Sequence, residues 1–405
     1  MKLIVIVKLF TKNIFIFGIN MIATLAFFKV LMYRTQTDIL ADYFYFKAIA
    51  MILFFVSRIG FSDIAYILKT SIHSNYKSLI RLLILTYGVF CTVLIILFIL
   101  LLFLEIEFIL LIFVAYSFYI LNDSIESFIN VSRLFYKYKI ILYYRIAHLF
   151  KAALFILIPS GGLNIFNILA FEVLFVAFLF VIIILTNFQH INKKVKPEIF
   201  YLLNNKNALY SGWFQSVGKI SYDALPQVIL ANVVSDSIFV EYNVARKLLS
   251  IFNNAVQPLL QVFVTESAKY KSSFDIFVKN YLKIIFPFCI ISLLTVTINY
   301  QLIIGILAKE QYAVELVRNL IIISFLLFSL HLCLYPIKQF LLLHNNYKNL
   351  TIGFFSSSLL MALISYISIL KVGVFAAVFI QGIGLSLPLI IAYLLYYHEK
   401  NKSSN

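Results

Sequence analysis

The chain has 405 residues, of which 63% are hydrophobic and only 12% are charged. Its apolar runs repeatedly reach the ~20 residues that a helix needs to cross ~30 Å of hydrocarbon, which excludes a soluble globular domain. The formal net charge of +16 does not indicate nucleic-acid binding, because the Lys and Arg residues lie in short segments between apolar runs and so report membrane topology.

The apolar runs are continuous and do not alternate, so they predict an all-α polytopic membrane protein. Reading hydropathy over about 19 residues predicts twelve transmembrane helices. In chain order, these spans are 13–33, 40–62, 80–104, 107–130, 139–159, 163–187, 208–232, 238–264, 280–300, 316–343, 347–370 and 373–397.

The longest polar connection, "QHINKKVKPEIFYLLNNKN", separates the sixth span from the seventh. It divides the chain into an N-terminal six-helix lobe (1–190), a cytoplasmic linker (191–207) and a C-terminal six-helix lobe (208–405). Lys and Arg are concentrated in alternate connections, roughly twenty on one side against four on the other, which predicts that both termini are cytoplasmic.

The residue patterns of common enzymes are missing from the sequence. The six histidines and three cysteines are scattered, without the spacing of a metal site or a disulfide framework. No glycine-rich phosphate loop and no nucleophile motif is present. We therefore expect no catalytic residue, no metal and no cofactor, and any active transport would draw on a gradient or on use of the product.

Ionisable side chains within spans are expensive in lipid and usually face a bundle interior or a wet cavity. Basic residues outnumber acidic ones in the predicted spans, which predicts a cationic cleft that attracts an anion. Phosphate is the anion that Arg and Lys bind best in a low-dielectric site. The candidate substrate-binding residues are Arg246, Lys247, Lys219, Lys47, Lys29, Lys151 and Arg58.

The segment "EYNVARKLLSIFNNAVQPLLQVF" carries a polar stripe whose members follow helical steps of three or four. We expect this stripe to line the cleft, with Arg246 as the phosphate-facing group. Lys247 points about 100° away, where it would meet the other lobe or extend toward the interface. The candidate cleft-lining residues are Ser250, Asn253 and Gln257 of this stripe and Gln215 of a comparable stripe in the preceding span.

The acidic residues Asp223, Glu126 and Asp123 are candidates for ion coupling. Structural roles are the alternative, because opposite charges in a membrane interior usually pair. Asp223 would then neutralise Lys219 four residues earlier. The other expected pairs are Asp123 or Glu126 with Arg145 or Lys151, Glu172 with Lys151, and Arg58 with Asp63. Lys29 and Lys47 lie near an interface and could reach it by snorkelling.

Several segments resemble the O-antigen flippases of the multidrug/oligosaccharidyl-lipid/polysaccharide (MOP) transporter superfamily. The resemblance covers nearly the whole chain and is carried by "YNVARKLLSIFNNAVQPLLQVFVTESAKY", "SRIGFSD", "ESFINVSRLFYKYKIILYYRIAHLFKAALFIL", "FLLLHNNYKNLTIGFF" and "KVGVFAAVFIQGIG". It implies two pseudo-symmetric lobes around a central cleft lined by the first, second, seventh and eighth spans.

The resemblance also implies a function. The expected substrate is an oligosaccharide linked to undecaprenyl pyrophosphate, moved across the bacterial inner membrane by alternating access. The expected partners are that lipid-linked glycan, the lipid bilayer, a polysaccharide polymerase and a chain-length regulator, and no nucleic acid.

Three alternatives remain. A multidrug or cation exporter of the same superfamily would need acidic groups in the cleft, whereas Lys29 is the single charge of the first span. An O-antigen polymerase would need a large external loop, and the expected external loops are short. A scaffolding membrane protein would not explain so many charges within spans.

Overall fold

The structure, a computed structural model, describes residues 3–58, 60–104, 106–159, 163–187, 196–204, 206–267, 274–307 and 314–404. Every element in these ranges is a helix, which confirms the expectation of an all-helical chain. The elements are α1 (Leu3–Arg34), α2 (Thr37–Ser57), α3 (Phe61–Ser71), α4 (Tyr76–Leu104), α5 (Glu107–Leu134), α6 (Tyr138–Ile156), α7 (Ile165–Asn187), α8 (Lys196–Asn204), α9 (Lys206–Lys219), the π-helical turn η3 (Ile220–Ala224), α10 (Leu225–Ala231), α11 (Asp236–Ser267), α12 (Phe274–Leu307), α13 (Val314–Leu343), α14 (Tyr347–Val372) and α15 (Val374–Ser404).

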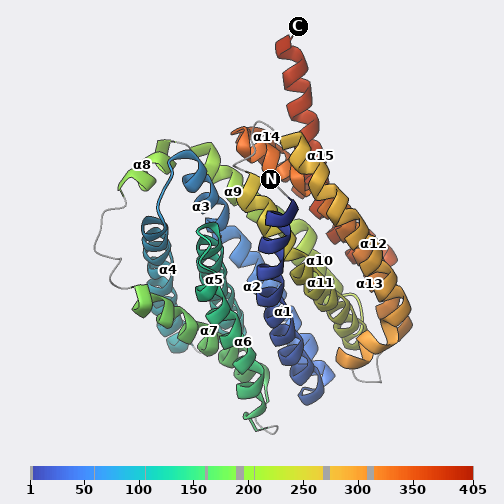
Figure 1. Ribbon diagram of the computed structural model, residues 1–405. Helices are drawn as coiled ribbons and strands as arrows, with labels where there is room; N and C mark the ends of the chain where they lie inside the picture. The colour runs from blue at the N-terminus through green and yellow to red at the C-terminus, as the bar shows by residue number, and fades with distance from the viewer. Residues whose placement is uncertain are drawn as a thin grey trace.

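The long helices lie roughly side by side in one bundle (Figure 1). Helices α4 to α7 occupy one side of the bundle, α12 to α15 occupy the other, and the two marked chain ends lie toward the same end. Helix α1 packs against α6 and α11, and α2 packs against α10 and α11. The seam between the first and second halves of the chain is therefore formed mainly by α1, α2, α10 and α11, with further contacts of α2 to α9 and η3.

Eight helices in the described part of the chain are long and apolar enough to cross a membrane. The other four expected spans correspond to α1, α6, α9 with η3 and α10, and α11. Helix α6 carries Lys139, Arg145 and Lys151, and the seventh expected span is interrupted by η3. These four are also helices that line the cavities described below, and the count of twelve spans and the orientation of the termini stay predictions.

Two short helices lie in segments that the hydropathy reading left between spans. Helix α3 follows α2 after a bend at Gly60, which adopts a φ of +68° that favours glycine. A Cβ on Gly60 would approach the carbonyl oxygen of Gly212 in α9 to 3.1 Å. Helix α8 lies within the predicted linker, whose residues 191–195 and 205 are outside the described residues.

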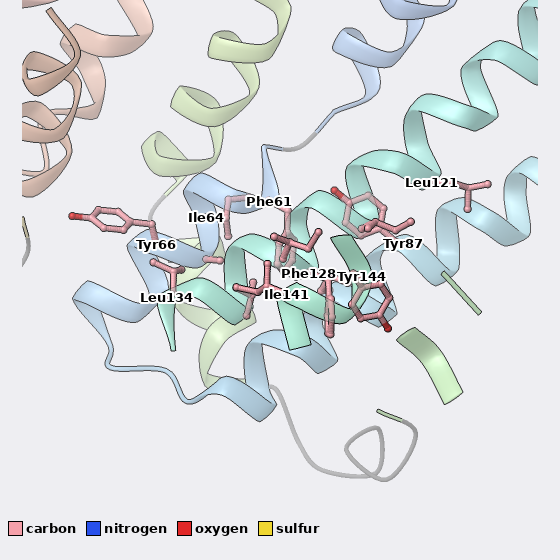
Figure 2. Close-up of a cluster of buried hydrophobic side chains, with 14 of the residues drawn as sticks. Phe61, Ile64, Tyr66, Tyr87, Leu121, Phe128, Leu134, Ile141 and Tyr144 are labelled. Carbon is pink, nitrogen blue, oxygen red and sulfur yellow. The ribbon is translucent and has the colours of Figure 1, made fainter. Parts of the chain in front are cut away.

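A buried apolar cluster joins α3, α4, α5 and α6 (Figure 2). The ring centroids of Phe61 and Tyr87 lie 6.2 Å apart, and those of Phe128 and Tyr144 lie 5.2 Å apart in an edge-on arrangement. Because lipid is as apolar as these side chains, close packing contributes more to the association of the helices than exclusion of water does. The cluster holds α5, whose Glu126 lines a cavity described below.

Glycines allow the C-terminal helices to approach closely. A Cβ on Gly353 of α14 would lie 2.5 Å from the carbonyl oxygen of Pro388 in α15. A Cβ on Gly384 of α15 would lie 2.2 Å from Cβ of Tyr222 in η3. Small residues at such contacts are typical of helix packing in membranes, and here they press α15 against the interrupted seventh span.

Candidate functional site

Two cavities lie inside the bundle. The first, the N-half cavity, has a volume of about 460 Å³ and is lined mainly by α1, α2, α5, α6, α7 and α11. The second, the C-half cavity, has a volume of about 540 Å³ and is lined mainly by α9, η3, α11, α13 and α15. Arg246 and Ser250 of α11 line both cavities, so this part of α11 forms the partition between them.

A buried carboxylate in the N-half cavity holds two lysines. Glu172 of α7 is 2% exposed, and its oxygens lie 2.6 Å from Nζ of Lys47 and 2.5 Å from Nζ of Lys151. The hydroxyl of Tyr43 donates a hydrogen bond of 2.8 Å to the same carboxylate. Lys47 therefore has a partner inside the protein instead of reaching the interface, and the expected pair of Glu172 with Lys151 is present.

The two lysines also face aromatic rings. Lys47 Nζ lies 3.9 Å from the ring centroid of Phe118, and Lys151 Nζ lies 3.9 Å from that of Phe27. These are distances at which a cation is attracted to the face of an aromatic ring. The arrangement carries one positive charge beyond what Glu172 neutralises.

A second ion pair lies on the wall of the N-half cavity. Arg145 of α6 donates two hydrogen bonds, of 2.7 and 2.9 Å, to the two carboxylate oxygens of Glu126 in α5. It also donates a hydrogen bond of 2.8 Å to the side-chain oxygen of Asn20 in α1. This bidentate pair is electrically neutral and links three helices.

Arg246 is neutralised by a residue of the π-helical turn. Its guanidinium donates a hydrogen bond to the carboxylate of Asp223 in η3, which also accepts one of 3.1 Å from Gln381 in α15. A π-helical turn inserts one extra residue into a helix and changes the direction of the side chains that follow, often at functional sites. The carbonyl of Asp223 accepts a hydrogen bond of 2.7 Å from the side chain of Gln227.

Lys247 lines the N-half cavity without an acidic partner. Among the side chains that the structure describes, no carboxylate lies within salt-bridge distance of Lys247. The contact that the structure gives it is the ring of Phe28 in α1, at 5.8 Å from Nζ to the centroid. This contact crosses the seam between the two halves of the chain.

The lining of the N-half cavity has an excess of positive charge. Its five basic side chains are Lys47, Arg145, Lys151, Arg246 and Lys247. Glu126 and Glu172 line the same cavity, and Asp223 neutralises Arg246 from the other side of the partition. With His148 counted as neutral, three carboxylates face five cations among the described residues, which leaves two positive charges.

The remaining predicted residues fall into two groups. Arg58 lines the C-half cavity and pairs with the buried carboxylate of Asp123 at 2.7 Å, whereas the side chain of Asp63 lies outside the described residues. Lys219, Gln215 and Asn253 also line the C-half cavity.

Two predicted residues have no described place in these cavities. Lys29 is exposed, with its Nζ 5.6 Å from the ring centroid of Tyr33, and it is not among the described lining residues of either cavity. The side chain of Gln257 lies outside the described residues, so its expected place on the polar stripe stays a prediction.

Two residues of the site were not predicted from the sequence, and a third has more contacts than predicted. Asn20 and Gln381 were not considered, although each is a polar residue within an apolar run, and that signal could have found them. Glu172 was expected to serve Lys151 alone, but it also binds Lys47 from α2. Hydropathy alone could not indicate this, because the second contact depends on how α2 packs against α7.

The fold is shared with known transporters. No model of a protein family matches the sequence, and no curated protein matches it significantly. A MOP superfamily transporter from Pyrococcus furiosus, described as having a binding pocket of reversed polarity, is 13% identical with a TM-score of 0.61, covering 99% of this chain and 96% of the other. The lipid II flippase MurJ in an inward closed conformation is 13% identical with a TM-score of 0.62, covering 96% of this chain and 87% of the other.

An outward-facing multidrug resistance transporter of the MATE family is also similar. It is 13% identical with a TM-score of 0.59, and the match covers 97% of this chain and 95% of the other. These likenesses extend over almost the whole chain. The protein therefore has the fold of the MOP superfamily transporters.

Proposed function

We propose that the protein is a flippase for an oligosaccharide linked to undecaprenyl pyrophosphate, the repeat unit of an O-antigen or a related surface polysaccharide. It would move this lipid from the inner to the outer leaflet of the bacterial inner membrane by alternating access. The observation that carries the proposal is the pair of uncompensated positive charges in the N-half cavity. In a low-dielectric cavity such charges attract an anion such as a diphosphate.

Lys247 is the better candidate for the diphosphate contact than Arg246. The guanidinium of Arg246 is already bound to Asp223, so a substrate phosphate would have to compete with a carboxylate. Lys247 offers an ammonium in the same cavity with no carboxylate at salt-bridge distance among the described side chains. Lys47 and Lys151 share one carboxylate and could supply the second positive charge.

The partition supports an alternating-access route. Because Arg246 and Ser250 line both cavities, a movement of α11 relative to η3 would change which cavity these two side chains face. Asp223 holds Arg246 in the present arrangement, so exchange of that carboxylate for the substrate diphosphate, or its protonation, would release the partition. We therefore keep Asp223 as a candidate for ion coupling. The other two candidates, Asp123 and Glu126, are each paired with an arginine in a similar way.

The lipid delivered to the outer leaflet also indicates which proteins would act with this one. A lipid-linked repeat unit delivered to the outer leaflet is the substrate of a polysaccharide polymerase and a chain-length regulator, which we propose as functional partners. The runner-up function is multidrug or cation export, since a multidrug resistance transporter of the MATE family has a similar fold. The excess of positive charge in the N-half cavity disfavours it, because cations would be repelled.

The test uses a strain in which the gene is deleted. The deletion strain is compared with the same strain carrying a gene copy of wild type, Lys247→Gln or Lys29→Gln. We expect the deletion to accumulate the lipid-linked oligosaccharide and to lose surface polysaccharide, both restored by wild type. Lys247→Gln should lower the transport rate about ten-fold or more, because a hydrogen bond to a charged group contributes ~1.5–3 kcal/mol. Lys29→Gln removes the same charge outside both cavities and should behave as wild type.

Two results would count against the proposal. If the deletion leaves both the lipid-linked oligosaccharide and the surface polysaccharide unchanged, the substrate is wrong. If the deletion accumulates the lipid-linked oligosaccharide but Lys247→Gln transports as wild type at equal protein level, the assigned anion contact is wrong and the substrate assignment stands.

A further inference from the structure

A third hollow, the lateral groove, lies between α12, α13 and α15 and has a volume of about 1060 Å³. Its described lining shares no residue with either cavity. Its apolar lining includes Pro336, Ile337 and Phe340 of α13 and Leu282 and Phe286 of α12. This volume is at the upper limit of the ~300–1,000 Å³ that is typical of ligand pockets.

A hydrogen bond joins two of the helices that form the groove. Pro336 lies within α13, where its missing N–H frees the carbonyl four residues earlier. That carbonyl belongs to Leu332 and accepts a hydrogen bond of 2.9 Å from the hydroxyl of Tyr281 in α12. This bond ties α12 to α13 beside the groove, so the hollow is part of the packed structure.

The rim of the groove is cationic. Lys279 and Lys283 lie one turn apart on α12, Lys400 lies on α15, and all three are exposed. No carboxylate is among the described residues that line the groove. Tyr393, Tyr396 and Tyr397 lie on α15, as Lys400 does, and tyrosines are enriched where a membrane meets water. The rim therefore suits an anionic group at the membrane surface.

The rest of the groove opens onto an apolar surface. On α12, Phe286 of the lining and the neighbouring Ile290 and Ile291 are 60%, 44% and 63% exposed, as expected for side chains that face lipid. From Val278 to Pro287 the α12 wall comprises ten residues, and the nine steps between them rise about 14 Å at ~1.5 Å per residue. That length is about half of the ~30 Å hydrocarbon thickness, the depth of one leaflet.

We propose that the lateral groove binds one anionic phospholipid of the surrounding membrane, with its phosphate on Lys279 and Lys283 and an acyl chain along α12 and α13. The lysine rim selects lipids with net negative charge, because a zwitterionic headgroup carries its own cation. Lysines near a membrane surface each contribute about five-fold to the binding of anionic lipid. The site is separate from the proposed transport route, and the proposal does not depend on the transported substrate.

The experiment is native mass spectrometry of the purified full-length protein in detergent, titrated with phosphatidylglycerol or with phosphatidylcholine. Wild type should bind one phosphatidylglycerol more tightly than phosphatidylcholine. Lys279→Gln/Lys283→Gln should weaken phosphatidylglycerol binding about 30-fold. Ile337→Trp adds bulk to the apolar lining but keeps the lysines, and it should also lower occupancy.

The matched control is Lys137→Gln/Lys139→Gln, which removes two exposed lysines at the start of α6, outside the groove, and should bind as wild type. Equal binding of the two lipids, or equal losses in the groove variant and the control, would overturn the proposal. Displacement of phosphatidylglycerol by equimolar undecaprenyl phosphate would overturn it too, because the groove would then belong to the lipid of the transported substrate.

Discussion

The buried carboxylate Glu172 provides the sharpest test of how the charges in the N-half cavity are balanced. The substitution Glu172→Gln leaves Lys47 and Lys151 without their shared acidic partner. All three side chains are largely buried: Lys47 is 15% exposed, Lys151 11% and Glu172 3%. Breaking a buried ion pair by removing one partner costs ~3–5 kcal/mol, because it leaves an uncompensated charge. We expect the free energy of unfolding to fall by about that amount.

The assay is reversible unfolding of the purified protein in mixed micelles, followed by its helical signal. The matched control is Glu399→Gln, whose partner Lys348 lies at 3.7 Å with both side chains more than half exposed. An exposed pair of this kind contributes at most ~1 kcal/mol. A loss for Glu172→Gln no larger than that for Glu399→Gln would refute the reasoning, because the lysines would then be hydrated well enough to stand alone.

Two further predictions concern the partition. In Gly384→Ala the new Cβ would lie 2.2 Å from Cβ of Tyr222, so α15 must move away from η3. We expect this variant to have a lower thermal denaturation temperature and slower transport. The control Gly88→Ala, whose new Cβ would have nothing within 4 Å, should be at least as stable as wild type. Asp223→Asn should cost about 2 kcal/mol, below the range for fully buried pairs because these side chains are 18% and 24% exposed. Adding Arg246→Gln should restore at least half of it in a double-mutant cycle, and additive losses would show that the two residues do not interact.

The helical bundle could be predicted because apolar length is a local property of the chain. The spans expected at 107–130 and 163–187 correspond to α5 (Glu107–Leu134) and α7 (Ile165–Asn187). Helix α3 was not expected, because its eleven residues are too few to span a membrane and they follow a bend at Gly60. The interruption at Ile220–Ala224 could not be seen either, because a π-helical turn depends on tertiary contacts such as that between Tyr222 and Gly384.

The site was predictable in its residue types but not in its pairing. Charges within spans could be identified from hydropathy, and many of them line the two cavities. Their partners come from other helices: Arg58 pairs with Asp123 in α5, and Arg246 pairs with Asp223 in η3. Helical periodicity placed Arg246 on a polar face but gave no information about the residue opposite it. The sequence therefore could not indicate that Lys247, and not Arg246, lacks a carboxylate partner among the described side chains of the N-half cavity.

The central claim is that this protein carries an anionic lipid-linked oligosaccharide across a membrane. The most direct measurement reconstitutes purified wild type and Lys247→Gln in proteoliposomes with an undecaprenyl-pyrophosphate-linked oligosaccharide and follows its exposure on the opposite leaflet. We predict rapid movement with wild type and movement slowed about ten-fold or more with Lys247→Gln. No movement above protein-free vesicles, together with extrusion of a cationic dye by the same preparation, would contradict the account and favour a multidrug exporter.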